Sequence, residues 1–155
     1  MVNIVLFQPQ IPQNTGNVAR TCAVTQSRLH LIGPMGFRIE DKKLKRAGLT
    51  YWPLLDITYY DDFDAFKRAH EHDAVFLLSS KGTQLYTEAV FPNDAYLLFG
   101  REDAGVPEEV HQWLSTRDYR IPMLALEEAR CLNLSTSVGI VLYEALRQQG
   151  FKDLS

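Results

Sequence analysis

The sequence predicts a single α/β domain, spanning residues 1–155, built on a mainly parallel β-sheet. One observation is a set of short, near-continuous apolar runs, which are typical of strands buried on both faces. The other is that helix-like segments alternate with these runs along the chain. A chain of 155 residues is long enough for one domain with a sizeable core. The apolar runs are Val2–Phe7, Leu29–Ile32, Ala74–Ser79, Ala95–Phe99 and Tyr119–Ile121, with a weaker one at Leu54–Tyr59.

The segments between these runs carry helix signals. Gly16–Gln26 follows Asn14 and Thr15, and either residue can cap a helix. Asp61–Glu71 has aspartates in its first turn and an apolar stripe at helical spacing. Leu134–Gln149 also repeats apolar residues at helical spacing, and a glycine follows it. The remaining candidates are Glu40–Ala47, which is basic, and Pro107–Leu114, in which proline opens the helix.

The composition is that of an ordinary soluble protein, with 46% hydrophobic and 23% charged residues. No apolar run approaches the roughly 20 residues that span a bilayer, and Met1–Phe7 has neither the basic start nor the cleavage site of a signal peptide. Cys22 and Cys131 form no disulfide framework, which fits a reducing compartment. We therefore expect a cytoplasmic protein with no membrane partner.

Three polar segments each follow an apolar run and lead toward a helix. They are Asn14–Arg20, Phe99–Pro107 and Arg130–Ser137. In an open α/β sheet, ligands bind outside the carboxyl ends of the strands. The three segments therefore predict one composite site, although each one alone also fits an ordinary capped helix or loop.

The start of the first helix is a candidate anion site. Free backbone amides and the helix dipole favour an anion such as phosphate there, and Arg20, about one turn further on, can add a guanidinium to it. Gly100 ends an apolar strand and can line an adenine or ribose pocket, with Glu102 accepting hydrogen bonds nearby.

A basic run stands out against the net charge of −3. Lysines and arginines followed by Tyr51 and Trp52 suit an RNA backbone and unstacked bases, although such runs are more often solvated faces. The run comprises Lys42, Lys43, Lys45 and Arg46.

Several common functional motifs are absent from the sequence. It has no Gly-x-Gly-x-x-Gly, no Walker A sequence and no Gly-x-Ser-x-Gly. His70, His72 and His111 do not form a metal set, and we expect His70 and His72 to be solvated at a helix end. These absences weaken the usual dinucleotide, hydrolase and metalloenzyme interpretations.

Taken together, the segments resemble the SPOUT superfamily of RNA methyltransferases, and most closely its small tRNA wobble-nucleotide 2′-O-ribose methyltransferases. Each piece is weak alone, but the ordered set is highly specific and covers nearly the whole chain. The pieces are Asn3–Leu6, Ile11–Asn17, Pro34–Phe37, Arg46–Leu49, Lys81–Thr83, Phe99–Gly100, Ile121–Met123, Asn133–Ser135 and Tyr143–Ala145.

The resemblance implies a fold and a cofactor. The fold has a deep trefoil knot in its C-terminal third and works as a homodimer. The cofactor is S-adenosylmethionine, and no metal is required. The residues implied in cofactor binding are Leu78, Gly100, Ile121, Cys131 and Leu132. This chain has Cys131-Leu132 where the family tends to have Ser-Met, and backbone contacts to the cofactor do not depend on that change.

The resemblance also implies the reaction, which is methyl transfer to a ribose 2′-oxygen of tRNA at the wobble nucleotide. Arg20, Glu102, Asn133 and Ser135 form the implied catalytic group. Because arginine is effectively always protonated, we expect Arg20 to hold the neighbouring phosphate and stabilise charge on the 2′-oxygen. The proton acceptor is then a phosphate oxygen or water. The residues assigned to RNA binding are Asn14, Asn17, Lys42, Lys43, Lys45, Arg46 and Tyr143.

Three other functions fit the same residues. One is a catalytically inactive RNA-binding protein on this fold, and another is a methyltransferase acting at another RNA site. The third is a metabolic α/β enzyme that holds a small phosphorylated substrate at Asn14–Arg20.

Overall fold

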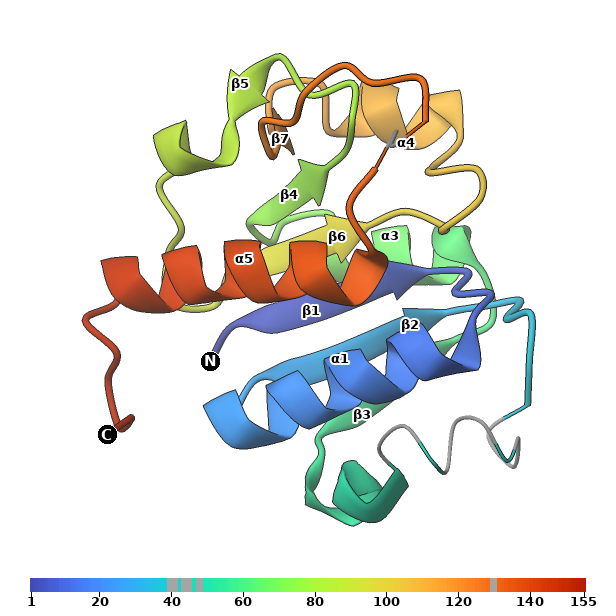
Figure 1. Cartoon of the computed structure of the whole chain (residues 1–155), viewed down its shortest axis with the longest axis vertical. Coiled ribbons are helices and arrows are strands. Elements are labelled where there is room, and N and C mark those ends of the chain that lie inside the picture. The colour runs from blue at the N-terminus through green and yellow to red at the C-terminus, as the bar shows by residue number, and fades with distance from the viewer. Residues whose placement is uncertain (39–41, 43–45, 47–48, 129–130) are drawn as a thin grey trace.

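The computed structural model describes every residue except 39–41, 43–45, 47–48 and 129–130. The described residues form a seven-stranded sheet in the order β3-β2-β1-β6-β4-β7-β5, and each neighbouring pair is parallel (Figure 1). This arrangement confirms the predicted fold class. The strands are β1 (Asn3–Phe7), β2 (Arg28–Ile32), β3 (Ile57–Tyr60), β4 (Val75–Leu78), β5 (Gln84–Leu85), β6 (Tyr96–Phe99) and β7 (Asp118–Arg120).

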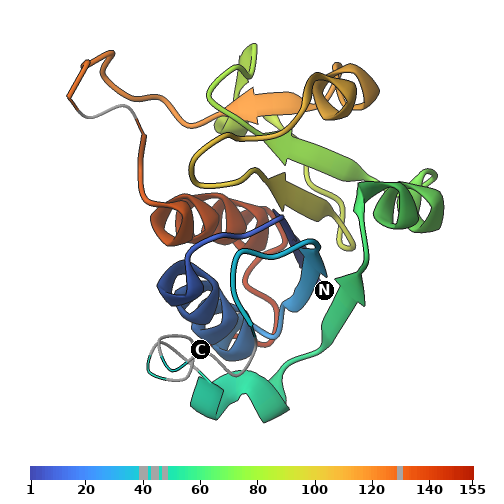
Figure 2. The same cartoon turned by 90° about the vertical axis from the view of Figure 1, so that its right-hand side faces the viewer.

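Helices cover both faces of the sheet. Helices α1 and α5 lie side by side on one face, and α3 and α4 lie on the other (Figures 1 and 2). Their bounds are α1 (Pro12–Thr25), α3 (Phe63–His70), α4 (Glu108–Trp113) and α5 (Leu134–Gln148), with short 3₁₀ helices η1 (Leu49–Leu54) and η2 (Tyr86–Glu88).

Strand β1 shows why the strands appear in the sequence as continuous apolar runs. Ile4 and Leu6 pack in the cluster under α1 and α5, whereas Val5 and Phe7 pack in the cluster under α3 and α4. Successive side chains of a strand point to opposite faces, and both faces of β1 are covered. The whole strand is consequently buried.

The structure corrects several predicted element bounds. Helix α1 begins at Pro12 rather than Gly16, since proline suits the first helical position, and its N-cap is Ile11. Asn14 and Thr15 are therefore not caps but buried residues of the first turns. The expected strand at 54–59 begins only at residue 57, because η1 occupies residues 49–54.

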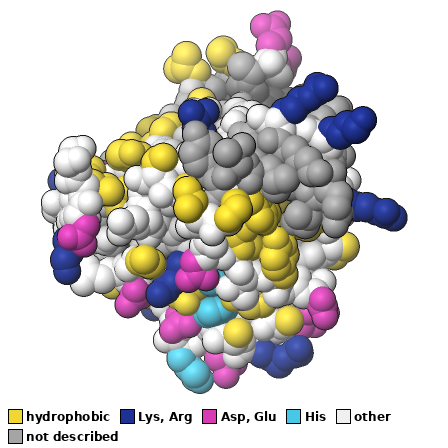
Figure 3. All heavy atoms as spheres, turned by 90° about the horizontal axis from the view of Figure 1, so that it is seen from below, with side chains coloured by type: hydrophobic (Ala, Val, Ile, Leu, Met, Phe, Trp, Pro, Cys, Tyr) yellow, Lys and Arg dark blue, Asp and Glu magenta, His cyan; other side chains and the backbone are white. Residues whose placement is uncertain are grey.

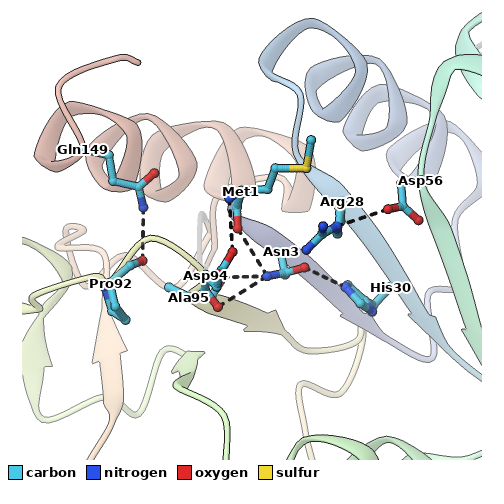
Figure 4. A network of polar contacts seen from close by, with 9 residues as sticks. All are labelled: Met1, Asn3, Arg28, His30, Asp56, Pro92, Asp94, Ala95 and Gln149. Carbon is cyan, nitrogen blue, oxygen red and sulfur yellow. Dashed lines mark hydrogen bonds and ion pairs between the residues drawn. The ribbon is translucent and has the colours of Figure 1, made fainter. Parts of the chain in front are cut away.

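A buried polar network joins the amino-terminal halves of β1 and β2 (Figure 4). The amide nitrogen of Asn3 donates to the carbonyl oxygens of Met1, Asp94 and Ala95, each at 3.4 Å. The amide oxygen of Asn3 lies 3.0 Å from Nε2 of His30. Asn3 is fully buried, so these contacts satisfy a side chain that would otherwise be costly to bury.

The face of the molecule seen from below carries both acidic and basic side chains (Figure 3). Seen from below, exposed hydrophobic side chains lie among acidic ones, and lysines and arginines project at the margin (Figure 3). Among the described residues, no helix is long and apolar enough to cross a membrane, and no group of histidines, cysteines and carboxylates is placed to hold a metal ion.

Candidate functional site

The carboxyl ends of the strands and the starts of α1 and α5 meet at one edge of the sheet, on the right in Figure 1. A cavity of about 580 Å³ opens there, a size typical of small-molecule sites. Its wall combines segments that follow β4, β6 and β7 with the first residues of α5. All three polar segments singled out in the sequence contribute to this wall.

The five residues implied in cofactor binding all line this one cavity. Leu78 ends β4, Gly100 follows β6, and Ile121 follows β7. Cys131 and Leu132 lie just before α5 and are exposed. The structure thus brings together positions that are far apart in the sequence, and their role in binding stays a prediction.

The loop after β6 is closed tightly on itself. The backbones of Arg101 and Gly105 exchange two hydrogen bonds, each 2.9 Å long. A Cβ atom at Gly100 would lie 2.6 Å from the carbonyl carbon of Gly105, so only glycine fits there. Gly105 has a φ of +64°, a conformation that favours glycine. Both glycines therefore shape this wall of the cavity.

Glu102 occupies the start of α1, where the sequence suggested a phosphate. Its carboxylate accepts hydrogen bonds from the backbone N–H groups of Gln10 at 2.9 Å and Ile11 at 3.2 Å. The amide N–H groups of Asn14 and Thr15 bond the carbonyl of Ile11. An internal carboxylate thus lies at this helix end, and the Asn14 and Thr15 amides, which the sequence suggested were free for a phosphate, are bonded within the chain. Phosphate binding near Arg20 stays a prediction.

A chain of side-chain hydrogen bonds joins the three polar segments. The Asn14 amide nitrogen lies 3.5 Å from Glu102 Oε1, and its oxygen accepts from the amide of Asn133 at 3.0 Å. The Asn133 oxygen caps α5 by accepting from the backbone N–H of Ser135 at 2.8 Å, and the Ser135 hydroxyl donates to the same oxygen. Asn14 is thereby the connection between Glu102 and the start of α5.

The other predicted site residues lie outside the cavity wall. Arg20 and Asn17 are exposed on α1, and Tyr143 is 48% exposed on α5. Lys42 and Arg46 are exposed in helical conformation, whereas Lys43 and Lys45 lie outside the described residues. The structure consequently places the implied catalytic arginine on α1 but outside the cavity wall.

Sequence reasoning missed a second polar cluster at the cavity. The buried carboxylate of Asp118 accepts from the Ser79 hydroxyl at 2.6 Å and contacts Nδ1 of His111 at 2.9 Å. Ser79 and His111 line the cavity, as does Lys81, whose backbone N–H donates to Ser79. These residues come from the segment that follows β4, from α4 and from β7, and no spacing in the sequence could have brought them together.

The residues present fit a nucleoside-containing cofactor. The wall carries apolar side chains, Leu78, Phe99, Ile121 and Leu134 among them, which suit a purine ring. Open space beside Gly105 lets a ligand approach the backbone closely. Lys81 adds a cation that can meet a carboxylate.

Comparison with known proteins gives consistent matches. Residues 1–143 match the model of the SpoU rRNA Methylase family. The tRNA (cytidine(34)-2′-O)-methyltransferase of Escherichia coli strain K12 is 43% identical over 152 residues, covering 97% of this chain and 96% of that protein.

Solved structures agree with this match. A structure described as giving insight into 2-OH methylation of C/U34 on tRNA is 47% identical, covers 98% of each chain and has a TM-score of 0.89. An AdoMet-bound rRNA methyltransferase from Sinorhizobium meliloti is 25% identical with a TM-score of 0.84, over 94% of this chain and 56% of that one. Given the family match along residues 1–143 and full-length relatives of the same architecture, the chain is a member of the SpoU rRNA methylase family.

Proposed function

We propose that this protein methylates the ribose 2′-oxygen of the wobble nucleotide of tRNA, using S-adenosylmethionine. One observation carries the proposal: the cavity at the carboxyl edge of the sheet is bordered by the hydrogen-bonded chain Glu102–Asn14–Asn133–Ser135. The relatives named for this reaction match the chain over nearly its whole length. The residues around the hydrogen-bonded series from Glu102 to Ser135 therefore form the proposed methyl-transfer site.

The cofactor would be held by Leu78, Gly100, Ile121, Cys131 and Leu132, which line the cavity. When bound, S-adenosylmethionine supplies a methyl group on a positively charged sulfonium, which is a good leaving group. The protein supplies position, since holding two reacting atoms in line removes much of the entropic barrier. The AdoMet-bound structure of a relative supports this assignment.

The catalytic group acts by orientation and electrostatics. Glu102 fixes Asn14, and Asn14 in turn orients the Asn133 amide, so that the start of α5 keeps one geometry. Ser135 stands beside that amide. Arg20 holds the phosphate next to the target ribose and stabilises negative charge on the 2′-oxygen. A phosphate oxygen or water takes the proton.

Binding of tRNA would use a local basic surface. The chain carries a net charge of −3, so overall charge does not attract RNA. Lys42 and Arg46 are exposed, and with Lys43 and Lys45 they would contact phosphates. Asn14, Asn17 and Tyr143 would contact the anticodon loop.

The proposal extends to the assembly and the chain path. Exposed Tyr143 on α5 and Val24, 59% exposed on α1, lie on the two helices that share one face of the sheet, which supports a homodimer through that face. Helix α5 follows β7 in the chain order but packs beside α1, on the other side of β6 and β4 in the sheet (Figure 2), which supports the C-terminal trefoil knot. Residues 1–155 would form one catalytic domain working in the cytoplasm, where the tRNA pool of its bacterial relatives lies.

The direct test is methyl transfer in vitro. Purified protein is incubated with unmodified tRNA and S-adenosylmethionine, and nuclease digestion with mass spectrometry maps the methylated ribose. The expected product carries one 2′-O-methyl group at the wobble nucleotide, and tRNA with a 2′-deoxy wobble residue should accept none. Methylation elsewhere would indicate another RNA site. Tight tRNA binding without transfer would indicate an inactive RNA-binding protein.

A further inference from the structure

The cluster Ser79–Asp118–His111 fixes the ring of His111 at the edge of the cavity. The Asp118 carboxylate can only accept hydrogen bonds when ionised. It accepts from the Ser79 hydroxyl at one oxygen, and its other oxygen lies 2.9 Å from His111 Nδ1. The His111 and Asp118 side chains are only 13% and 10% exposed. His111 Nδ1 therefore carries a proton that it donates to Asp118.

This donation sets the chemistry of the other ring nitrogen. In a neutral imidazole with a proton on Nδ1, Nε2 is an acceptor. Among the described residues, Nε2 of His111 has no hydrogen-bond partner. It is not buried, because the only buried side-chain polar atom without a partner in that part of the chain is the Thr15 hydroxyl. Nε2 is consequently an accessible acceptor on a residue that lines the cavity.

The other acceptors in the wall are already engaged. Glu102 accepts from two backbone N–H groups, and Asp103 accepts from Arg101 at both oxygens. The amide oxygens of Asn14 and Asn133 each accept from a neighbour within the polar chain. Among the acceptor atoms of the described carboxylate, amide and imidazole groups that line the cavity, only Nε2 of His111 accepts no hydrogen bond.

We propose that His111 is a specificity residue for the cofactor, accepting a hydrogen bond at Nε2 from an amino group of the ligand, with Asp118 as the positioning residue. The inference rests on the proposed function, because it assumes an adenosyl amino acid in this cavity. That ligand has two amino groups, the 6-amino group of adenine and the α-amino group. A site with a fixed acceptor rejects a ligand that lacks the matching donor.

The experiment measures dissociation constants by calorimetry rather than activity. S-adenosylhomocysteine is compared with two analogues, the inosine analogue, in which a 6-oxo group replaces the amino group, and the deaminated analogue, in which hydrogen replaces the α-amino group. For the natural protein, we expect one of the two changes to weaken binding roughly ten-fold, as a lost hydrogen bond does. The affected analogue identifies the amino group that His111 contacts.

Variants then connect that penalty to His111. In His111→Leu the penalty should shrink to about two-fold or less, and His111→Gln should keep part of it because its amide retains an acceptor. Asp118→Asn is the sharper test, since an Asn amide can donate to Nδ1 and move the imidazole proton to Nε2. That variant should lose the discrimination, or reverse it in favour of the 6-oxo analogue when the adenine amine is the contact. His72→Leu, at a side chain that is 92% exposed, is the matched control.

The ratio of the dissociation constants of the analogue and of S-adenosylhomocysteine separates recognition from folding, because a loss of stability weakens the binding of both ligands alike. An unchanged ratio in His111→Leu and Asp118→Asn would overturn the inference while leaving the cofactor assignment intact. Failure of the natural protein to bind S-adenosylhomocysteine at all would overturn both.

Discussion

Burial at His30 fixes both its protonation and its hydrogen-bond direction. The amide nitrogen of Asn3 donates to three backbone carbonyls, so the amide oxygen of Asn3 faces His30. Nε2 of His30 must therefore donate to that oxygen. Nδ1 then accepts from the hydroxyl of Tyr60 at 2.9 Å. Burial, followed by the charge of His70, lowers the pKa of His30 to about 4, and burial raises the pKa of Tyr60 to about 12. Both groups are neutral near pH 7.

His30 should therefore make stability depend on pH. Its pKa is about 4 in the folded chain and 6.5 ordinarily, so the unfolded chain binds the proton more tightly. The stability is fully present above about pH 6.5 and falls as the pH drops toward 4, by up to about 3 kcal/mol. Urea unfolding from pH 7.5 to 4.5 measures this slope. His30→Gln should flatten it, whereas exposed His72→Gln should not. Equal slopes in all three proteins would contradict the assignment.

Arg20 is the residue whose role is most open to a kinetic test. Arg20→Ala should leave cofactor binding nearly intact and lower the rate at saturating tRNA by about 10²–10³, as losing a transition-state contact does. Lysine should restore only part of the rate, because it lacks the guanidinium fork. Arg68→Ala, an exposed arginine on α3, is the control. If only the Michaelis constant for tRNA rises, Arg20 is a phosphate anchor and not catalytic.

At the scale of elements, the connection between β4 and β5 depends on a close backbone approach. A Cβ atom at Gly82 would lie 2.3 Å from the carbonyl carbon of Tyr119 in β7. Backbone cannot move aside as a side chain can, so any larger residue separates this connection from β7. The cavity wall at Ser79 and Lys81 belongs to the same segment.

Gly82→Ala should consequently be costly for both folding and ligand binding. We expect a loss of about 2–4 kcal/mol in the free energy of unfolding and weaker binding of S-adenosylhomocysteine, measured by urea unfolding and calorimetry. Thr83→Ala, in the same connection but exposed and outside the cavity wall, should change neither measurably. A Gly82→Ala protein as stable as the natural one would show that the connection can shift freely.

The basic segment should act on tRNA affinity and not on the rate at saturation. Replacing Lys42 and Arg46 by glutamine should remove the two proposed phosphate contacts, and each lost contact should flatten the salt dependence of the affinity by roughly one unit of slope. Binding titrations over a range of salt concentrations measure this slope. The same charge change at Lys67 and Arg68 on α3 is the control, and an equal effect there would show only a general influence of charge.

At the scale of the whole molecule, the sequence predicted the sheet well, since strands buried on both faces leave apolar runs that can be recognised without a partner. The short β5, Gln84–Leu85, was missed because two residues form no pattern. The capping role expected of Asn14 was wrong because α1 begins at Pro12, and the Asn14 side chain bonds Asn133 instead. His70, expected to be solvated, bonds Tyr60 and Asp73, and that contact also depends on the completed fold.

The same reasoning applies to the site. The five cavity positions followed from resemblance to a family, whereas His111 and Asp118 could be found only in three dimensions. A side chain that acquires its role through a partner on another element leaves no local trace in the sequence.

Assembly offers the remaining prediction. If α1 and α5 form the proposed homodimer face, sedimentation at micromolar concentration should give twice the chain mass of 17.7 kDa. Tyr143→Asp, placing a charge on an exposed aromatic of α5, should shift the protein toward monomer and lower its stability. Tyr59→Asp, on β3, serves as the control because Tyr59 is similarly exposed, at 50%. A natural protein that sediments as a fully active monomer would rule out the dimer.

The hydrogen bond between Asn14 and Asn133 joins residues 119 positions apart. A ribosome makes chains from the amino terminus at about 5–20 residues per second, so Asn14 emerges many seconds before its partner. During that interval β1 and α1 exist without α5, and Glu102 and the cavity wall are absent or incomplete. A nascent chain therefore lacks the proposed methyl-transfer site until its last helix is released, and we expect premature termination anywhere before α5 to give an inert fragment rather than a partly active enzyme.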